Sequence, residues 1–329
     1  MSAPGDTRGI SIGSIESWDL DEYAEQVGPW DVRLDKVSAG KFHSAMRFLK
    51  VPGVTLYDEH WEHRVVVRGS PPEGLVMLGT NLAPGQSDVR WCGQLLDTHL
   101  FGCAEGPGDI DFVMPNRAHD AVVLIDPELF ERAVGSDARE KVNRSSHVDF
   151  DAATGLALAR TMVELLDHYH RQPALLQLEG EAARFRSRLL GMLADCFAGE
   201  STDSHLSPSQ RGEMLQRALE HIESNITKTS AWETAEALGI SRRTLEHLFR
   251  DSLGTTPGKY LGLLRLNRCH HDLYHADPSK ESVTSVAMRW GFTHLGRFSG
   301  AYRKHFGELP SETLGKSRPH KRSARLTPL

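Results

Sequence analysis

The sequence predicts an α+β protein of two domains, with a β-rich N-terminal domain followed by an all-α C-terminal domain. At 329 residues the chain is long enough for each domain to have its own core. Short apolar runs separated by Pro and Gly clusters fill residues 30–125, whereas helical periodicity dominates from Asp151 onward. Charge divides the chain as well, because residues 205–329 carry a formal net charge of +7 and residues 1–204 carry −13.

The N-terminal domain is expected to be a small antiparallel β-barrel. Residues 1–28 are polar and rich in Gly and Ser, so we expect them to form a loose lead-in, and we assign 29–198 to the domain itself. Strand-like runs such as HRVVVRG and AVVLI alternate with turn clusters such as Pro52-Gly53 and Pro84-Gly85. Many short strands at this spacing are typical of a small barrel or sandwich.

A helical hairpin is predicted at the end of this domain, over residues 151–198. Apolar residues recur at helical spacing around Met162 in its first half and around Leu189 in its second. Two interpretations remain open: the hairpin packs on the β domain of its own chain, or one of its helices also forms a homodimer interface. Residues 199–210 are polar and are predicted to link the domains.

The C-terminal domain, 211–315, contains one pattern twice. Ala235, Gly239 and Ile240 recur 52 residues later as Ala287, Gly291 and Phe292. Four further positions recur with a shift of 53, namely Leu245, Phe249, Gly254 and Pro257 as Phe298, Tyr302, Gly307 and Pro310. Two helices around a Gly turn are typical of a helix-turn-helix, which this sequence therefore carries in duplicate, followed by a basic tail at 316–329.

The second helix of each unit is a candidate DNA reader, because such helices enter the major groove with their N-terminal turns. In the first unit the spacing of the apolar residues leaves four side chains pointing outward as candidate base contacts: Arg242, Arg243, Glu246 and His247. In the second unit the outward side chains are shorter and less polar. The candidate base contacts there are Leu295, Gly296 and Ser299. We expect phosphate contacts from Arg250, His294, Arg297 and Arg303. The alternative interpretation is an ordinary solvated helix face.

The region from about Leu215 to Leu314 resembles the DNA-binding domain of the AraC/XylS family of bacterial transcription regulators. The motif runs A-x-x-x-G-I-S-x-x-x-L-x-x-x-F, then R-L-N-R, then F-S-x-x-Y-R-x-x-F-G-x-x-P-S. The resemblance implies two helix-turn-helix units joined by a connector helix, which bind successive major grooves of promoter DNA and work with RNA polymerase. Gly300 departs from the family, which often has a long side chain there. The N-terminal domain is similar, more loosely, to the family's cupin-like sensor domain.

Candidate ligand-binding residues in the β domain are aromatic residues and histidines. We single out as effector contacts His60, Trp61, His63, Trp91 and Phe112. The spacing in HWEH differs from the H-x-H of cupin metal enzymes, so we expect no metal and no cofactor. Ordinary barrel core residues are the alternative interpretation. The P-loop, G-x-S-x-G and H-E-x-x-H motifs are all absent, so no catalytic residue is predicted.

The leading hypothesis is a cytoplasmic, ligand-responsive activator of a catabolic or metabolic operon that binds double-stranded promoter DNA and an unknown small-molecule effector. No apolar run approaches the roughly 20 residues that span a bilayer, and no export signal is visible at the N-terminus. The four cysteines form no CxxC pair and are expected to be reduced. Two alternatives are a cupin-type metal enzyme fused to a DNA-targeting domain and an adaptor that acts through another DNA-bound protein.

Overall fold

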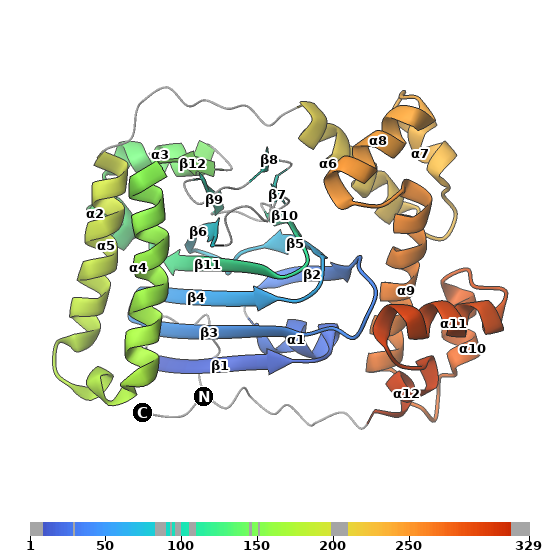
Figure 1. The fold of residues 1–329 in the computed structure, drawn as a ribbon, viewed down its shortest axis with the longest axis horizontal. Coiled ribbons are helices and arrows are strands. Elements are labelled where there is room, and N and C mark those ends of the chain that lie inside the picture. The colour runs from blue at the N-terminus through green and yellow to red at the C-terminus, as the bar shows by residue number, and fades with distance from the viewer. Residues whose placement is uncertain are drawn as a thin grey trace.

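The computed structural model describes residues 9–28, 30–82, 90–92, 94–95, 100–104, 110–144, 147–150, 152–198 and 210–316. The predicted linker, 199–210, and the predicted basic tail, 316–329, lie outside the described residues apart from Gln210 and Lys316. Two β-sheets form the centre of the molecule, with two long helices on one side and the C-terminal helices on the other (Figure 1).

Both sheets are antiparallel throughout their described pairings. The larger sheet contains, in spatial order, β1 (Ser11–Ser17), β3 (Ser44–Val51), β4 (Val54–Trp61), β11 (Ala118–Ile125), β6 (Val76–Asn81), β9 (Leu100–Ala104) and β12 (His147–Asp149). The smaller sheet contains β2 (Asp31–Lys36), β5 (Val65–Ser70), β10 (Ile110–Met114), β7 (Arg90–Trp91) and β8 (Gln94–Leu95).

The predicted closed barrel is wrong, although the antiparallel β architecture is confirmed. Among the described strands no ladder joins the two sheets, which face each other as two open layers. Alternation of apolar residues along a strand determines which face is buried, but a sandwich and a barrel both satisfy it. Only the hydrogen bonds at the strand edges distinguish the two, and those edges leave no clear trace in the sequence.

The predicted loose lead-in is also wrong from Ser11 onward. Strand β1 pairs with β3 along its whole length, from Ser11 opposite Lys50 to Ser17 opposite Ser44, and it buries Ile12 and Ile15. Helix α1 (Leu20–Gln26) follows, and the Asp19 carboxylate caps it by accepting from the backbone N–H groups of its first turn. Some polar residues of this segment, such as Ser14 and Glu16, occupy exposed positions of regular structure, whereas Ser17 and Asp19 are buried.

The outer face of the larger sheet is covered by helices. After α2 (Pro127–Val134) and α3 (Ser136–Arg144), the chain forms α4 (Ala152–Arg171), a 3₁₀ turn (Pro173–Gln177) and α5 (Glu181–Ala198). Met162 of α4 and Leu189 of α5 are fully buried in one cluster with Leu49, Leu56 and Val123 of the sheet. The hairpin thus packs within its own chain, as the first interpretation predicts. The described residues include no helix long and apolar enough to cross a bilayer.

The C-terminal helices form two units joined by a long helix. The first contains α6 (Gln210–Ser224), α7 (Ala231–Ala237) and α8 (Arg242–Leu253), and the second contains α10 (Val283–Arg289), α11 (Leu295–Phe306) and α12 (Pro310–Gly315). Helix α9 (Pro257–His275) connects them and places them at its opposite ends (Figure 1). Each unit has its own apolar cluster, around Phe249 in the first and around Tyr302 in the second.

Candidate DNA-binding surface and ligand cavity

The two repeats share their turns as well as their cores. Helices α7 and α10 start with capping boxes, at Ser230 and Ser282. Gly239 and Gly291, which end these helices, have φ values of +66° and +84°, in the left-handed region that favours glycine. The turn therefore holds the second helix of each unit at a fixed angle to the first, which confirms the duplicated helix-turn-helix.

The first reading helix, α8, presents a polar face at its N-terminal end. Leu245, Leu248 and Phe249 are buried, as their spacing predicts. Four of the predicted DNA-contacting residues are exposed and one is half-buried: Arg242, Arg243, His247 and Arg250 are exposed, and Glu246 is half-buried. The Arg250 guanidinium lies 3.7 Å from the Glu246 carboxylate. Such an exposed pair contributes little to stability, so both groups are available to a ligand.

The second reading helix, α11, offers a shallower surface. Its buried side is made by Phe298, Tyr302, His305 and Phe306. The predicted contacts all lie on the remaining surface: His294, Gly296, Arg297 and Arg303 are exposed, and Leu295 and Ser299 are half-buried. Gly300 is also exposed, and a Cβ added there would meet no other atom within 4 Å. This face can approach DNA closely while providing few long donors.

Between the two sheets lies a cavity of about 70 Å³. Its walls are mostly apolar and aromatic, and they come from α1 and from strands of both sheets. Three of the five predicted effector residues line it, namely Trp61, Trp91 and Phe112. The other two, His60 and His63, do not. Strand alternation places His60 on the face opposite Trp61, where its ring stacks on His119 with 3.9 Å between centroids.

Two cavity residues that the sequence analysis did not single out are carboxylates, Glu59 and Asp120. They stand directly opposite each other on β4 and β11. Burial and, to a lesser extent, the charge of Asp58 raise the pKa of Glu59 to about 7. Burial and the neighbouring carboxylates raise the pKa of Asp120 well above its ordinary value. Their signal in the sequence is weak, because Glu59 lies between Asp58 and His60 and Asp120 follows His119, so only the strand register shows which of these side chains face inward.

The helical units dock on the smaller sheet through charged and polar contacts. Glu223 of α6 accepts hydrogen bonds from Arg33 of β2 and from Arg68 of β5, the latter at 2.5 Å. Arg268 of α9 donates to Asp35 of β2 at 2.8 Å. Val37, Val66 and Val113 of the β domain belong to the same apolar cluster as the first helical unit. The β domain and the helical domain therefore share one continuous interface.

Lys36 of β2 is central to this interface. Lys36 is fully buried, and its ammonium group donates hydrogen bonds to the carbonyl oxygens of Ser38, Gly40 and His305. Burial lowers the pKa of Lys36 to about 7. His305 of α11 in turn lies 3.1 Å, through Nε2, from the Lys36 carbonyl oxygen, and burial together with the Lys36 charge lowers the pKa of His305 to about 3. The C-terminal end of the second reading helix, α11, is thus anchored to the β domain.

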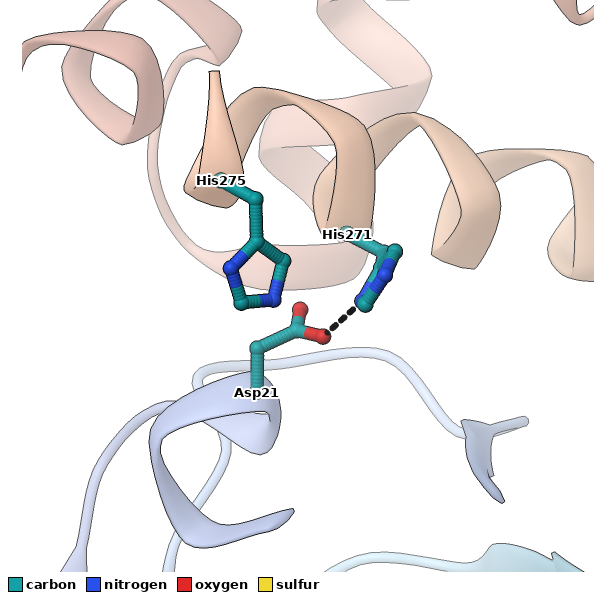
Figure 2. A group of neighbouring side chains, drawn as sticks. All are labelled: Asp21, His271 and His275. Carbon is teal, nitrogen blue, oxygen red and sulfur yellow. Dashed lines mark hydrogen bonds and ion pairs between the residues drawn. The ribbon is translucent and has the colours of Figure 1, made fainter. Parts of the chain in front are cut away.

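At the edge of the interface, Asp21 of α1 contacts α9. Its two carboxylate oxygens lie 2.7 Å from His270 Nδ1 and 2.6 Å from His271 Nδ1, and His275 also points toward Asp21 (Figure 2). The hydrogen bonds from both histidines hold the pKa of Asp21 well below its usual range, against the opposing effect of burial.

Histidines and carboxylates gather in three places among the described residues: Asp21 with His271 and His275, Asp58 with His60 and His119, and Asp19 with His270 and Glu308. In each group at least one imidazole is already within hydrogen-bonding distance or ion-pairing reach of its carboxylate. We therefore interpret these groups as ion pairs, and not as metal ligand sets.

Residues 234–316 match the helix-turn-helix domain family. The chain is 40% identical over 102 residues to a probable thc operon regulatory protein of Rhodococcus erythropolis, covering 31% of each chain. It is 36% identical over 137 residues to a XylDLEGF operon transcriptional activator of Pseudomonas putida, covering 41% of each. The C-terminal domain is a helix-turn-helix domain similar to those of these two operon regulators.

The solved structures include an AraC-type DNA-binding domain protein from Chromobacterium violaceum, which is 36% identical over 32% of this chain and 95% of its own, with a TM-score of 0.31. The AraC-like transcriptional activator CuxR covers 80% of this chain and 96% of its own, at 17% identity and a TM-score of 0.44. The chain spans only 31% of the length of the Rhodococcus regulator and 41% of the length of the Pseudomonas activator. The helix-turn-helix domain accounts for much of each matched part.

Proposed function

We propose that the protein is a ligand-responsive, sequence-specific transcription regulator, an activator of a catabolic or metabolic operon. The observation that carries the proposal is the duplicated AraC/XylS-type helix-turn-helix, whose first reading helix presents exposed basic side chains at its N-terminal end. Related proteins of this type are operon regulators and not enzymes. We assign residues 29–198 to effector binding and dimerisation, and 211–315 to DNA binding.

The two reading helices take unequal parts in recognition. Arg243 can form a bidentate pair with guanine, and Glu246 can accept from cytosine N4. We assign base contacts to the α8 residues and expect α11 to contribute fewer, through Leu295, Gly296 and Ser299. Phosphate contacts from Arg250, His294, Arg297 and Arg303 would set the position on DNA without specifying sequence.

Helix α1 is the physical link between ligand and DNA in this proposal. Tyr23 of α1 and Val27, the residue that follows this helix, line the cavity, and Asp21 of α1 contacts α9 (Figure 2). A ligand that displaces Tyr23 would change the position of Asp21, and therefore the hold of the β domain on the connector helix. A homodimer through 151–198, contact with RNA polymerase and a cytoplasmic location complete the proposal.

The test is binding of the full chain to the promoter beside its own gene, measured against random DNA of equal length across a salt series. We expect specific binding at least about 10³-fold tighter than non-specific binding at physiological salt. Equal affinity for both DNAs would overturn the proposal. Binding that appears only with a second DNA-bound protein would favour the adaptor alternative, and turnover of a small substrate would favour the enzyme.

A further inference from the structure

The cavity between the sheets contains an arrangement that is unfavourable without a ligand. Glu59 and Asp120 lie directly opposite each other on neighbouring strands, where Cβ atoms are roughly 5 Å apart and like charges destabilise the pair. Asp120 is only 3% exposed. Within the described part of the chain, no hydrogen bond or ion pair links either carboxylate to a basic side chain. Burial raises the pKa of both groups, so without a cation nearby they tend to hold their protons, and ionising them requires a compensating charge.

Two buried polar atoms of the cavity wall also lack partners. Asp120 Oδ1 and Trp61 Nε1 make no hydrogen bond of acceptable geometry among the described residues, and the residues that carry them are at least nine-tenths buried. The Trp61 indole is nevertheless near enough to both carboxyl groups to oppose the rise of their pKa values. An unsatisfied buried acceptor of this kind costs about 1–3 kcal/mol unless a ligand or water supplies the missing donor. The Asp120 acceptor indicates that the missing group is an N–H or O–H donor.

The rest of the wall selects the body of the ligand. Aromatic rings surround the carboxylates, and they belong to Tyr23, Trp30, Trp61, Trp91 and Phe112. Faces of such rings attract cations as well as apolar groups. A volume of about 70 Å³, compared with roughly 10–15 Å³ for one water on the same measure, leaves room for a ligand of only a few heavy atoms.

We propose that this cavity binds a small organic cation, a primary alkylammonium whose N–H groups donate to Asp120 and Glu59 while its carbon chain lies against the aromatic wall. The ammonium compensates the two carboxylates and satisfies the unpaired Asp120 oxygen. An anion would lie against two acidic groups with no cation to compensate it, and a neutral alcohol of the same length cannot compensate the carboxylates when they ionise. This inference rests on the proposed function, because it names the chemistry of the effector.

The test uses the full chain and follows tryptophan fluorescence, since three of the six tryptophans line the cavity. The probes are the n-alkylammonium ions from ethyl to hexyl, each compared with the alcohol and the carboxylate of the same length. We expect saturable binding of at least one ammonium ion, at least about tenfold tighter than its alcohol, and no binding of the carboxylates. Equal binding of ammonium and alcohol, or no saturable binding by any ammonium ion, would overturn the inference.

Substitutions of the two carboxylates test whether the ammonium ion binds in this cavity. Asp120→Asn and Glu59→Gln keep the size of the side chains and should each weaken ammonium binding at least about tenfold. The matched control, Glu62→Gln, changes an exposed carboxylate just after β4 and should bind as the unmodified chain does. Thermal melts confirm that the variants fold, which is expected because each substitution replaces one of two facing acidic groups by a neutral side chain of the same size. Unchanged ammonium binding by Asp120→Asn would also overturn the inference.

Promoter binding by the same preparations separates this inference from the proposed function. Discrimination between promoter and random DNA without ammonium binding would remove only the ligand assignment. Loss of that discrimination would remove the proposed function, whatever the cavity binds.

Discussion

The facing carboxylates Glu59 and Asp120 should make stability depend on pH in an unusual direction. Because burial raises the pKa of Glu59 from 4.5 to about 7, the folded state holds a proton there that the unfolded state has lost. Stability is therefore highest below about pH 4.5 for this group and falls as the pH rises to about 7. Asp120, whose pKa is also raised, acts in the same direction.

Glu59→Gln should remove the part of this pH-dependent loss of stability that comes from Glu59. Without ligand, we expect the variant to be more stable than the unmodified chain by up to about 3 kcal/mol at pH 8, and by no more than about 1 kcal/mol at pH 5. Urea unfolding at both pH values measures the difference. An equal effect of the substitution at pH 5 and pH 8 would contradict the assigned pKa.

The same residues show what the sequence reveals at the scale of single side chains. Trp61, Trp91 and Phe112 could be predicted as cavity residues because large aromatics inside a β domain seek its interior. His60 was predicted as a ligand contact because it is a histidine, yet its neighbours Glu59 and Trp61 are the residues that line the cavity. The face of a strand follows from register, and register depends on pairing with β11, which lies far away in the chain.

At the scale of elements, the reading helices were predictable because their caps, turns and apolar spacing are all local. Gly239 and Gly300 give a test of that local logic. Gly239 has a φ of +66° in a turn, whereas Gly300 lies inside α11 with open space around its Cα. Gly239→Ala should destabilise by about 1 kcal/mol, and Gly300→Ala should stabilise by about 0.5–1 kcal/mol. Denaturant midpoints of the two variants are expected to move in opposite directions, and a shift of both in one direction would contradict the assignment.

The unequal reading helices lead to a second prediction at this scale. Arg243→Ala should relax the preference at one base pair, by about 1–3 kcal/mol, because a base contact is lost. Arg303→Ala should weaken binding to all sequences alike and reduce the salt slope by about 1, because a phosphate contact is lost. Affinities for a set of single-base operator variants at several salt concentrations distinguish the two patterns. Identical behaviour of both variants would contradict the division of roles.

For the whole molecule, the contacts between the two domains are the feature that the sequence predicts least well. The partners of Lys36, Asp21 and Arg268 are separated from them by more than 200 residues, and no local period connects them. Asp21 lay in a segment expected to be loose, so its contact with α9 could not be anticipated. The division into a β domain and a helical domain was predictable, because composition and period both change along the chain.

The Asp21 contact helps the β domain to hold the connector helix, beside the bond from Arg268 to Asp35. Although burial lowers the pKa of His270, its hydrogen bond to Asp21 and the nearby carboxylates of Glu308 and Asp19 raise that pKa to about 9. A raised histidine pKa means that the stabilisation is complete below about pH 6.5 and is lost as the pH rises through about 9. Asp21→Asn should therefore destabilise the chain by about 2 kcal/mol near neutral pH, because it leaves a buried charged imidazole less well paired.

The difference in unfolding free energy between Asp21→Asn and the unmodified chain should become smaller as the pH approaches 10. Hydrogen exchange provides the second measurement, with faster exchange expected in α1 and α9 and little change in α4 and α5 on the far side of the sheets (Figure 1). Glu25→Gln is the matched control, because Glu25 lies on the same helix and its exposed carboxylate is 3.6 Å from His275. Such an exposed pair is worth less than about 1 kcal/mol. Equal effects of the two substitutions would show that Asp21 does not hold α9, and that ligand and DNA communicate by another route.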